Sequence, residues 1–151
     1  MGPTMEACDL TDNGDITRAV KAPEPVGAYP HARRVGDLLF LSGIGPRVRG
    51  ETRIPGVNVD ETGRVVSSDI EAQCRSVFVN VRQVLAEAGS SWERLVDVTV
   101  FLTHMEEDFA IYNRIYAEYF ADNQPCRTTV EVKSLPTPIS IELKCIATIE
   151  D

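Results

Sequence analysis

Apolar side chains recur at helical spacing in two segments of the chain. Between Ser68 and Ala88 they return every three or four positions, which predicts an amphipathic helix. Ser68 and Glu71 have the spacing of a capping box at its start, and Gly89 suits its C-terminal end. A second helix is predicted from about Glu106 to Phe120. Its aromatic stripe is expected to be core and comprises Met105, Phe109, Tyr112, Tyr116 and Phe120.

Alternating or continuous apolar runs predict the strands. Residues 32–35 and 38–42 flank Gly36-Asp37, a two-residue turn typical of a hairpin. Residues 95–103 alternate, and Val96, Val98, Val100 and Leu102 are predicted to share one face.

Two further strands are predicted at Cys126–Lys133 and Ile139–Ile149, joined by a turn that contains proline. Because side chains alternate along a strand, Arg127, Thr129 and Glu131 share one face of the first. Glu142, Lys144, Ile146 and Thr148 share one face of the second.

The order of elements predicts one domain of the α+β class, with both helices on one side of a mixed sheet. The domain is expected to span residues 22–151, after a polar tail or loosely docked arm at residues 1–21. Residues 45–67 are rich in Gly, Pro and charge and are expected to form a long loop with one short strand near Arg64–Val66. The uncovered side of the sheet predicts a symmetric homo-oligomer.

Composition narrows the classes of partner. The net charge of −8 disfavours a nucleic-acid partner, because phosphate contacts require a basic face. No apolar run approaches the roughly 20 residues that span a membrane, and the N-terminus lacks signal-peptide features, so a cytoplasmic location is the expectation. The four cysteines are scattered without CxxC spacing, so we expect no metal site, and Cys74, Cys126 and Cys145 are expected to be buried thiols.

Arg127 and Glu142 are the strongest candidates for chemistry, on what we expect to be neighbouring strands. Arginine grips a carboxylate through a planar fork of donors, and glutamate can hold or deprotonate a water. Together they suit the binding and hydrolysis of a small organic acid. Two structural alternatives remain open, in which Arg127 is an exposed or salt-bridged residue and Glu142 pairs with Lys144 or Arg127.

Several blocks in a fixed order resemble the RidA/YjgF family of enamine/imine deaminases, from about Ala22 to Ile149. The blocks are Gly27–Ala32, Val35–Gly43, Asp69–Gln73, Val98–Thr103, Tyr112-Asn113, Tyr116–Phe120 and the two segments around Arg127 and Glu142. The resemblance implies a chorismate-mutase-like fold and a homotrimer with active sites in the clefts between subunits. It also implies hydrolytic deamination that needs no metal or organic cofactor.

The resemblance also implies roles for individual residues. Arg127 falls on the arginine that holds the substrate carboxylate, and Glu142 falls on the glutamate credited with positioning the attacking water. Tyr29 falls on the site tyrosine. The remaining positions are Ser42 and Gly43, from the family's Ser-Gly pair, and Thr129, whose main-chain carbonyl would help to hold the water.

Three positions depart from the family pattern and suggest a substrate. His31 stands beside the site tyrosine, and Arg47 and Arg49 make the following loop more basic than usual. These features resemble the 2-aminomuconate deaminase branch, which would convert this enamine dicarboxylate to 4-oxalocrotonate and ammonia. His31 with Arg47 or Arg49 would then bind the distal carboxylate. A structural hydrogen bond in the first strand is the open alternative for His31.

Other functions remain open alternatives. One is a general deaminase of 2-aminoacrylate or 2-iminobutyrate, and another is a ligand-binding or chaperone-like module without turnover. A ribonuclease suits the charge of −8 poorly.

Overall fold

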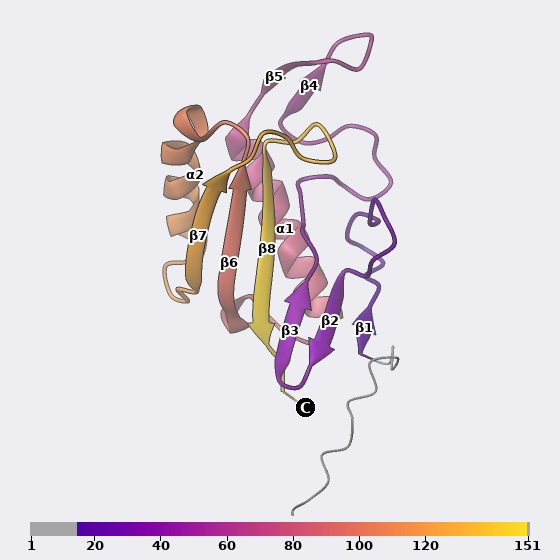
Figure 1. The fold of residues 1–151 in the computed structure, drawn as a ribbon, viewed down its shortest axis with the longest axis vertical. Coiled ribbons are helices and arrows are strands. Elements are labelled where there is room, and N and C mark those ends of the chain that lie inside the picture. Colours follow the sequence, from indigo (N-terminus) through magenta and orange to yellow (C-terminus); the bar gives the residue numbers. More distant parts are fainter. Residues whose placement is uncertain (1–14, 151) are drawn as a thin grey trace, which may run out of the picture.

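The computed structural model describes residues 15–150, which form one mixed sheet, one separate hairpin and two long helices (Figure 1). The strands are β1 (Ile16–Thr17), β2 (Ala32–Val35), β3 (Leu38–Leu41), β4 (Val57–Val59), β5 (Val65–Ser68), β6 (Leu95–Leu102), β7 (Cys126–Glu131) and β8 (Ile141–Thr148). The helices are α1 (Ile70–Glu87) and α2 (Met105–Tyr119), with a short 3₁₀ turn, η1 (Trp92–Arg94), between α1 and β6. The large sheet has the order β1-β2-β3-β8-β6-β7, and only its β6–β7 pair is parallel. The predicted α+β fold with a mixed sheet is confirmed.

Both helices pack on one face of the sheet, as predicted. The inward residues of β6 and β8, such as Val98, Val100 and Leu143, are 0–1% exposed and belong to one core cluster with the buried residues of both helices. From α2, Tyr112 and Ile115 are fully buried, whereas Phe109 remains 38% exposed. The predicted aromatic stripe of α2 therefore belongs to the core only in part.

Two local predictions are corrected. The N-cap of α1 is Asp69, whose carboxylate accepts a hydrogen bond from the amide of Ala72, so the capping box from Ser68 does not form. Val96 is 39% exposed, because pairing between β6 and β8 is irregular between Leu95 and Asp97. This irregularity turns Val96 away from the face that it was predicted to share with Val98.

The described part of the predicted tail belongs to the fold. Strand β1 pairs with β2, and Ala19 is only 4% exposed. Residues 1–14 lie outside the described residues, so the prediction of a tail there stays a prediction. In the long loop, β5 lies at the predicted short strand, and β4 pairs with it to form an arm that projects from the body (Figure 1).

The second face of the sheet is uncovered in the single chain and carries large apolar side chains. Phe40 and Leu38 of β3 are 36% and 41% exposed, and Val130 of β7 is 37% exposed. Phe40 lies opposite Ile146 of β8 in the register. Cys126 lies on this face too and is exposed, contrary to the prediction of a buried thiol, whereas Cys74 and Cys145 are buried as predicted. We call this surface the open face.

None of the helices in residues 15–150 is long and apolar enough to cross a membrane.

Candidate functional site

Arg127 and Glu142 lie on opposite faces of the sheet. Arg127 pairs with Val98 and therefore points to the helical side, while Glu142 pairs with Phe101 and points to the open face. Their strands are not neighbours, because β6 lies between β7 and β8. Within one chain the two side chains cannot act on the same substrate.

The Arg127 guanidinium is held by α2. Its central carbon lies 4.7 Å from the centre of the Tyr116 ring and 5.5 Å from that of Tyr112, and Nη1 donates to the side-chain oxygen of Asn113 at 2.9 Å. Burial raises the pKa of Tyr116 to about 12, and that of Tyr112 further, although the Arg127 charge opposes both shifts. The phenols therefore stay neutral. Within residues 15–150 no carboxylate lies at salt-bridge distance from Arg127, so the salt-bridged alternative is not found among these residues.

Glu142 is half-buried beside Gly43 on the open face. A Cβ on Gly43 would come within 2.9 Å of the Glu142 carboxyl carbon, so the carboxyl group occupies the space that glycine leaves. Desolvation raises the pKa of Glu142, and the nearby positive charge of Arg47 partly offsets this. The alternative of pairing with Lys144 does not occur, because the Lys144 ammonium donates to the carbonyl of Leu41 instead. A half-buried carboxyl group with a raised pKa is suited to accept a proton from a water.

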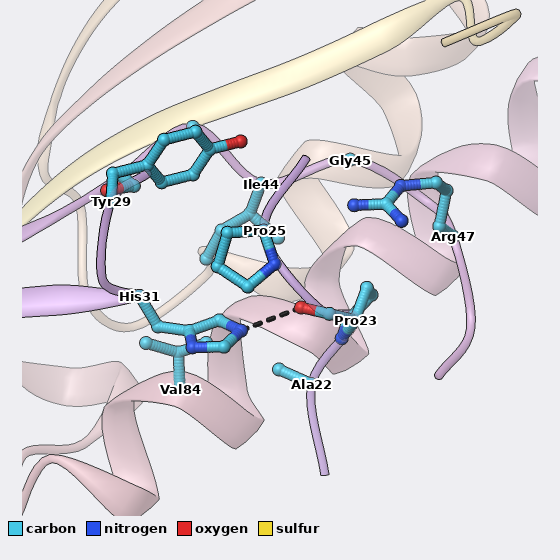
Figure 2. A pocket seen from close by; sticks show the side chains of 11 residues that line it. Ala22, Pro23, Pro25, Tyr29, His31, Ile44, Gly45, Arg47 and Val84 are labelled. Carbon is cyan, nitrogen blue, oxygen red and sulfur yellow. Dashed lines mark hydrogen bonds between the residues drawn. The ribbon is translucent and has the colours of Figure 1, made fainter. Parts of the chain in front are cut away.

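A small pocket of about 30 Å³ lies beside Gly43, and Figure 2 shows its walls. Tyr29 lies on one side and Arg47 on another, with the backbone of Ile44 and Gly45 between them. The Tyr29 hydroxyl is close to the backbone amide of Val26, which donates to it at 3.2 Å. Ser42 also lines the pocket, but its hydroxyl donates to the carbonyl of Pro30 at 2.7 Å. The structure therefore brings five predicted site residues together: Tyr29, Ser42, Gly43, Arg47 and Glu142.

His31 lines the same pocket but has no ring nitrogen left for a substrate. Nδ1 accepts from the amide of Ala19 at 3.0 Å, and Nε2 donates to the carbonyl of Pro23 at 2.7 Å (Figure 2). The structural alternative for His31 is the one that the chain adopts.

Arg49 is also engaged elsewhere and does not line this pocket. Its guanidinium donates to the carbonyls of Ala19 and Ala22 and to the carboxylate of Glu24. Hydrogen bonds to residues 19–24 thus give Arg49 a structural role, and its predicted contact with substrate stays a prediction.

Thr129 lies with Arg127 on the helical side of β7, as predicted, and its buried hydroxyl has no hydrogen-bond partner among the described residues. The role of its main-chain carbonyl stays a prediction. Sequence reasoning missed Asn113 as the partner of Arg127. The available signal was its place next to Tyr112, which puts it on the side of α2 that faces β7.

Within residues 15–150 no group of three or more His, Cys, Asp or Glu side chains is placed to hold a metal ion. The arrangement offers instead two cationic groups, a carboxyl group with a raised pKa and a tyrosine. Glu142, Arg47 and Tyr29, which lie together, can bind an anion and move a proton, whereas Arg127 lies on the other face of the sheet from Glu142.

Comparison with known proteins agrees with this geometry. Residues 19–149 match the family described as Endoribonuclease L-PSP. A RutC family protein of Pyrococcus abyssi is 41% identical over 84% of this chain and 91% of its own length. Reactive Intermediate Deaminase A of Arabidopsis thaliana, a chloroplast protein, is 34% identical over 89% of this chain and 66% of its own. The crystal structure of Escherichia coli TdcF with bound serine superposes with a TM-score of 0.76, at 28% identity, over 89% of this chain and 98% of that one.

Proposed function

Because this chain belongs to the RidA/YjgF family, we propose that it deaminates enamine and imine acids by hydrolysis, with 2-aminomuconate as the preferred substrate. The family and the relative named as a reactive intermediate deaminase support deamination of imines and enamines in general. The observation that carries the choice of a dicarboxylate is Arg47, a second cationic group beside Glu142 and separate from Arg127.

The reaction needs few groups. The enamine tautomerises to an imine, and protonation of its nitrogen makes the C2 carbon electrophilic. Water adds to C2 to form a carbinolamine, and cleavage of the C–N bond releases ammonia and leaves the 2-oxo acid. Glu142 takes a proton from the attacking water and can return it to the leaving nitrogen. Positioning and proton transfer supply the modest acceleration that a hydrolytically labile imine requires.

The two guanidinium groups hold the ends of the substrate in this proposal. Arg127 binds the carboxylate next to the nitrogen, and the Tyr116 ring and Asn113 fix the plane of its fork. Arg47 binds the distal carboxylate from the pocket that Tyr29 also lines. His31 is not part of this binding set, because the backbone of Ala19 and Pro23 uses both of its ring nitrogens. Arg49 is left out because it does not line the pocket.

A complete site then requires more than one chain, and we propose a homotrimer with sites between subunits. Arg127 and Glu142 face opposite sides of the sheet, so Arg127 of one subunit would meet Glu142 of the next. The exposed apolar side chains of the open face supply the surface that such an assembly would bury.

Substrate preference is tested by ammonia release from 2-aminomuconate, generated enzymatically, beside 2-aminoacrylate and 2-iminobutyrate. We expect the wild type to prefer 2-aminomuconate and Arg127→Ala to lose turnover of all three. Arg47→Leu should lower kcat/KM for 2-aminomuconate by about 10- to 100-fold, the usual worth of a charge-assisted hydrogen bond, and leave the monocarboxylates nearly unchanged. Arg53→Leu, at an exposed arginine of the same loop, is the matched control.

Other outcomes would favour the alternatives. Preference for the short imines, with no effect of Arg47→Leu, would make the protein a general deaminase. Absence of turnover for all three substrates would contradict an enzymatic role and favour a binding module.

A further inference from the structure

Residues 19–24, which we call the strap, are part of the connection between β1 and β2 and contribute to one wall of the pocket. Ala22 and Pro23 line the pocket beside His31, as Figure 2 shows. The Glu24 carbonyl accepts a hydrogen bond from Arg47 Nη2 at 2.8 Å. The strap therefore contacts the guanidinium that we assign to the distal carboxylate, and a shift of the strap would break or redirect this hydrogen bond.

The His31 ring forms hydrogen bonds to both ends of the strap, at Ala19 and at Pro23. The amide of Ala19 can only donate, so Nδ1 must be unprotonated, and the carbonyl of Pro23 can only accept, so Nε2 must carry the proton. The ring is 8% exposed, which leaves little room for water to replace either partner. A proton added at Nδ1 would place two N–H groups against each other and break the contact with Ala19.

Two further side chains hold the strap without depending on the protonation of His31. Arg49 donates to the carbonyls of Ala19 and Ala22. Glu87 of α1 accepts from the amides of Val20 and Lys21, at 2.8 and 3.3 Å. The hydrogen bonds from these two amides lower the pKa of Glu87, and the bond from Val20 is the larger cause. Glu87 therefore stays ionised in mildly acidic solution.

We propose that His31 is a latch that positions Arg47 through the strap, and that protonation of His31 releases this latch and weakens selectivity for a second carboxylate. The inference rests on the proposed role of Arg47. His31 is a positioning residue here, because it acts through residues 19–24 and not on the substrate.

Charged groups from three parts of the chain surround His31. Lys21 and Glu24 belong to the strap, Arg47 and Arg49 come from the loop after β3, and Glu87 comes from α1. Lysine and arginine stay protonated throughout this range, and glutamate carboxyls ordinarily titrate near pH 4. Histidine is the side-chain type that ordinarily changes its charge between about pH 5 and about pH 8, so His31→Gln, which cannot titrate, isolates its part in any pH response.

Selectivity is the first readout, expressed as the ratio of kcat/KM for 2-aminomuconate to that for 2-iminobutyrate. The ratio cancels the ionisation of Glu142, which both reactions share. In the wild type it should fall by about threefold or more between about pH 8 and about pH 5.5 as the latch opens. His31→Gln, which keeps an acceptor and a donor but cannot titrate, should give a ratio independent of pH. His31→Leu should give the low ratio at both values, and His104→Gln should behave as the wild type does.

Hydrogen exchange at the Ala19 amide is the second readout and does not depend on the substrate. Corrected for its intrinsic rate, protection of this amide should fall between pH 8 and pH 5.5 in the wild type and stay constant in His31→Gln. Unchanged protection in the wild type would overturn the latch, whatever the assays give. Loss of protection without turnover of 2-aminomuconate would support the latch and contradict the proposed substrate. Loss of protection with an unchanged ratio would contradict the link from the latch to Arg47.

Discussion

The carboxyl group of Glu142 occupies the space that a Cβ atom on residue 43 would need, and Gly43 leaves that space open. A Cβ on Gly43 would lie 2.9 Å from the carboxyl carbon of Glu142 and 2.9 Å from its Oε2. Real Cβ atoms do not approach so closely, so any side chain at position 43 must displace the carboxyl group. Glycine is thus required here for the placement of Glu142 and not for an unusual backbone angle, since the left-handed glycines of residues 15–150 lie elsewhere.

Gly43→Ala should therefore lower activity more than stability. The Glu142 side chain can rotate away at small cost, but a displacement of about 1 Å from the reacting carbon can reduce kcat/KM about 100-fold. We expect ammonia release to fall by that order while the melting temperature changes by only a few degrees. Gly63→Ala is the opposite control, because Gly63 has φ of +84° with open space around it, so stability should fall and activity should not. Full activity in Gly43→Ala would contradict a role for Glu142 at its observed position.

The pH profile should report Glu142. Its pKa is raised by desolvation, so the ionised form that accepts a proton from water is lost at a higher pH than for an ordinary glutamate. The acid limb of kcat/KM should thus lie above the usual carboxyl range. Arg47 stabilises the carboxylate, so Arg47→Leu should move this limb to still higher pH, measured with 2-iminobutyrate, which lacks a distal carboxylate. A limb that moves to lower pH in this variant would contradict the assigned contact.

Asn113 should control substrate affinity through Arg127. Its side-chain oxygen accepts from Nη1 of Arg127, so Asn113→Ala should free the guanidinium and raise KM about tenfold with a smaller effect on kcat. Asn113→Asp should raise KM further, because a carboxylate at that place competes with the substrate for the same fork. Asn123→Ala is the matched control, since Asn123 donates to the carbonyls of Trp92 and Leu95 and should affect stability only. Equal kinetics for the Ala and Asp variants at position 113 would contradict this role.

The open face should drive assembly. Phe40 and Ile146 lie opposite each other on it, and a charged group there would have to be desolvated in an interface. Phe40→Asp should shift the protein to monomers in light scattering coupled to size-exclusion chromatography. Val79→Asp, at a 62% exposed position of α1, should leave the oligomeric state unchanged. An unchanged mass for Phe40→Asp would show that this face is not the interface.

Local periodicity predicted most of the fold because side-chain alternation is decided within a few residues. It gave both long helices, the hairpin around Gly36-Asp37 and the shared face of Arg127 and Thr129. It failed where pairing between distant strands decided the outcome. Val96 turns outward because of the irregular β6–β8 register, and residues 16–17 become a strand only by pairing with β2.

For the candidate site, too, the sequence predicted what is decided locally and missed what depends on distant parts of the chain. The resemblance selected Arg127 and Glu142, but alternation along each strand could not relate the two faces, which depends on β6 lying between them. His31 and Arg49 look like substrate ligands in a linear sequence. Their actual partners are backbone groups 8 to 30 positions away, and such contacts leave no periodic signal.

The central claim is a deaminase site that takes Arg127 from one subunit and Glu142 from another, and subunit mixing tests it most directly. Arg127→Ala and Glu142→Gln chains, each inactive alone and carrying different tags, are co-expressed and the mixed oligomers purified. In every mixed trimer, whatever its ratio of the two chains, one of the three sites combines an intact Arg127 with an intact Glu142, so about a third of wild-type ammonia release should return. Mixed oligomers no more active than their two parents would contradict the shared site.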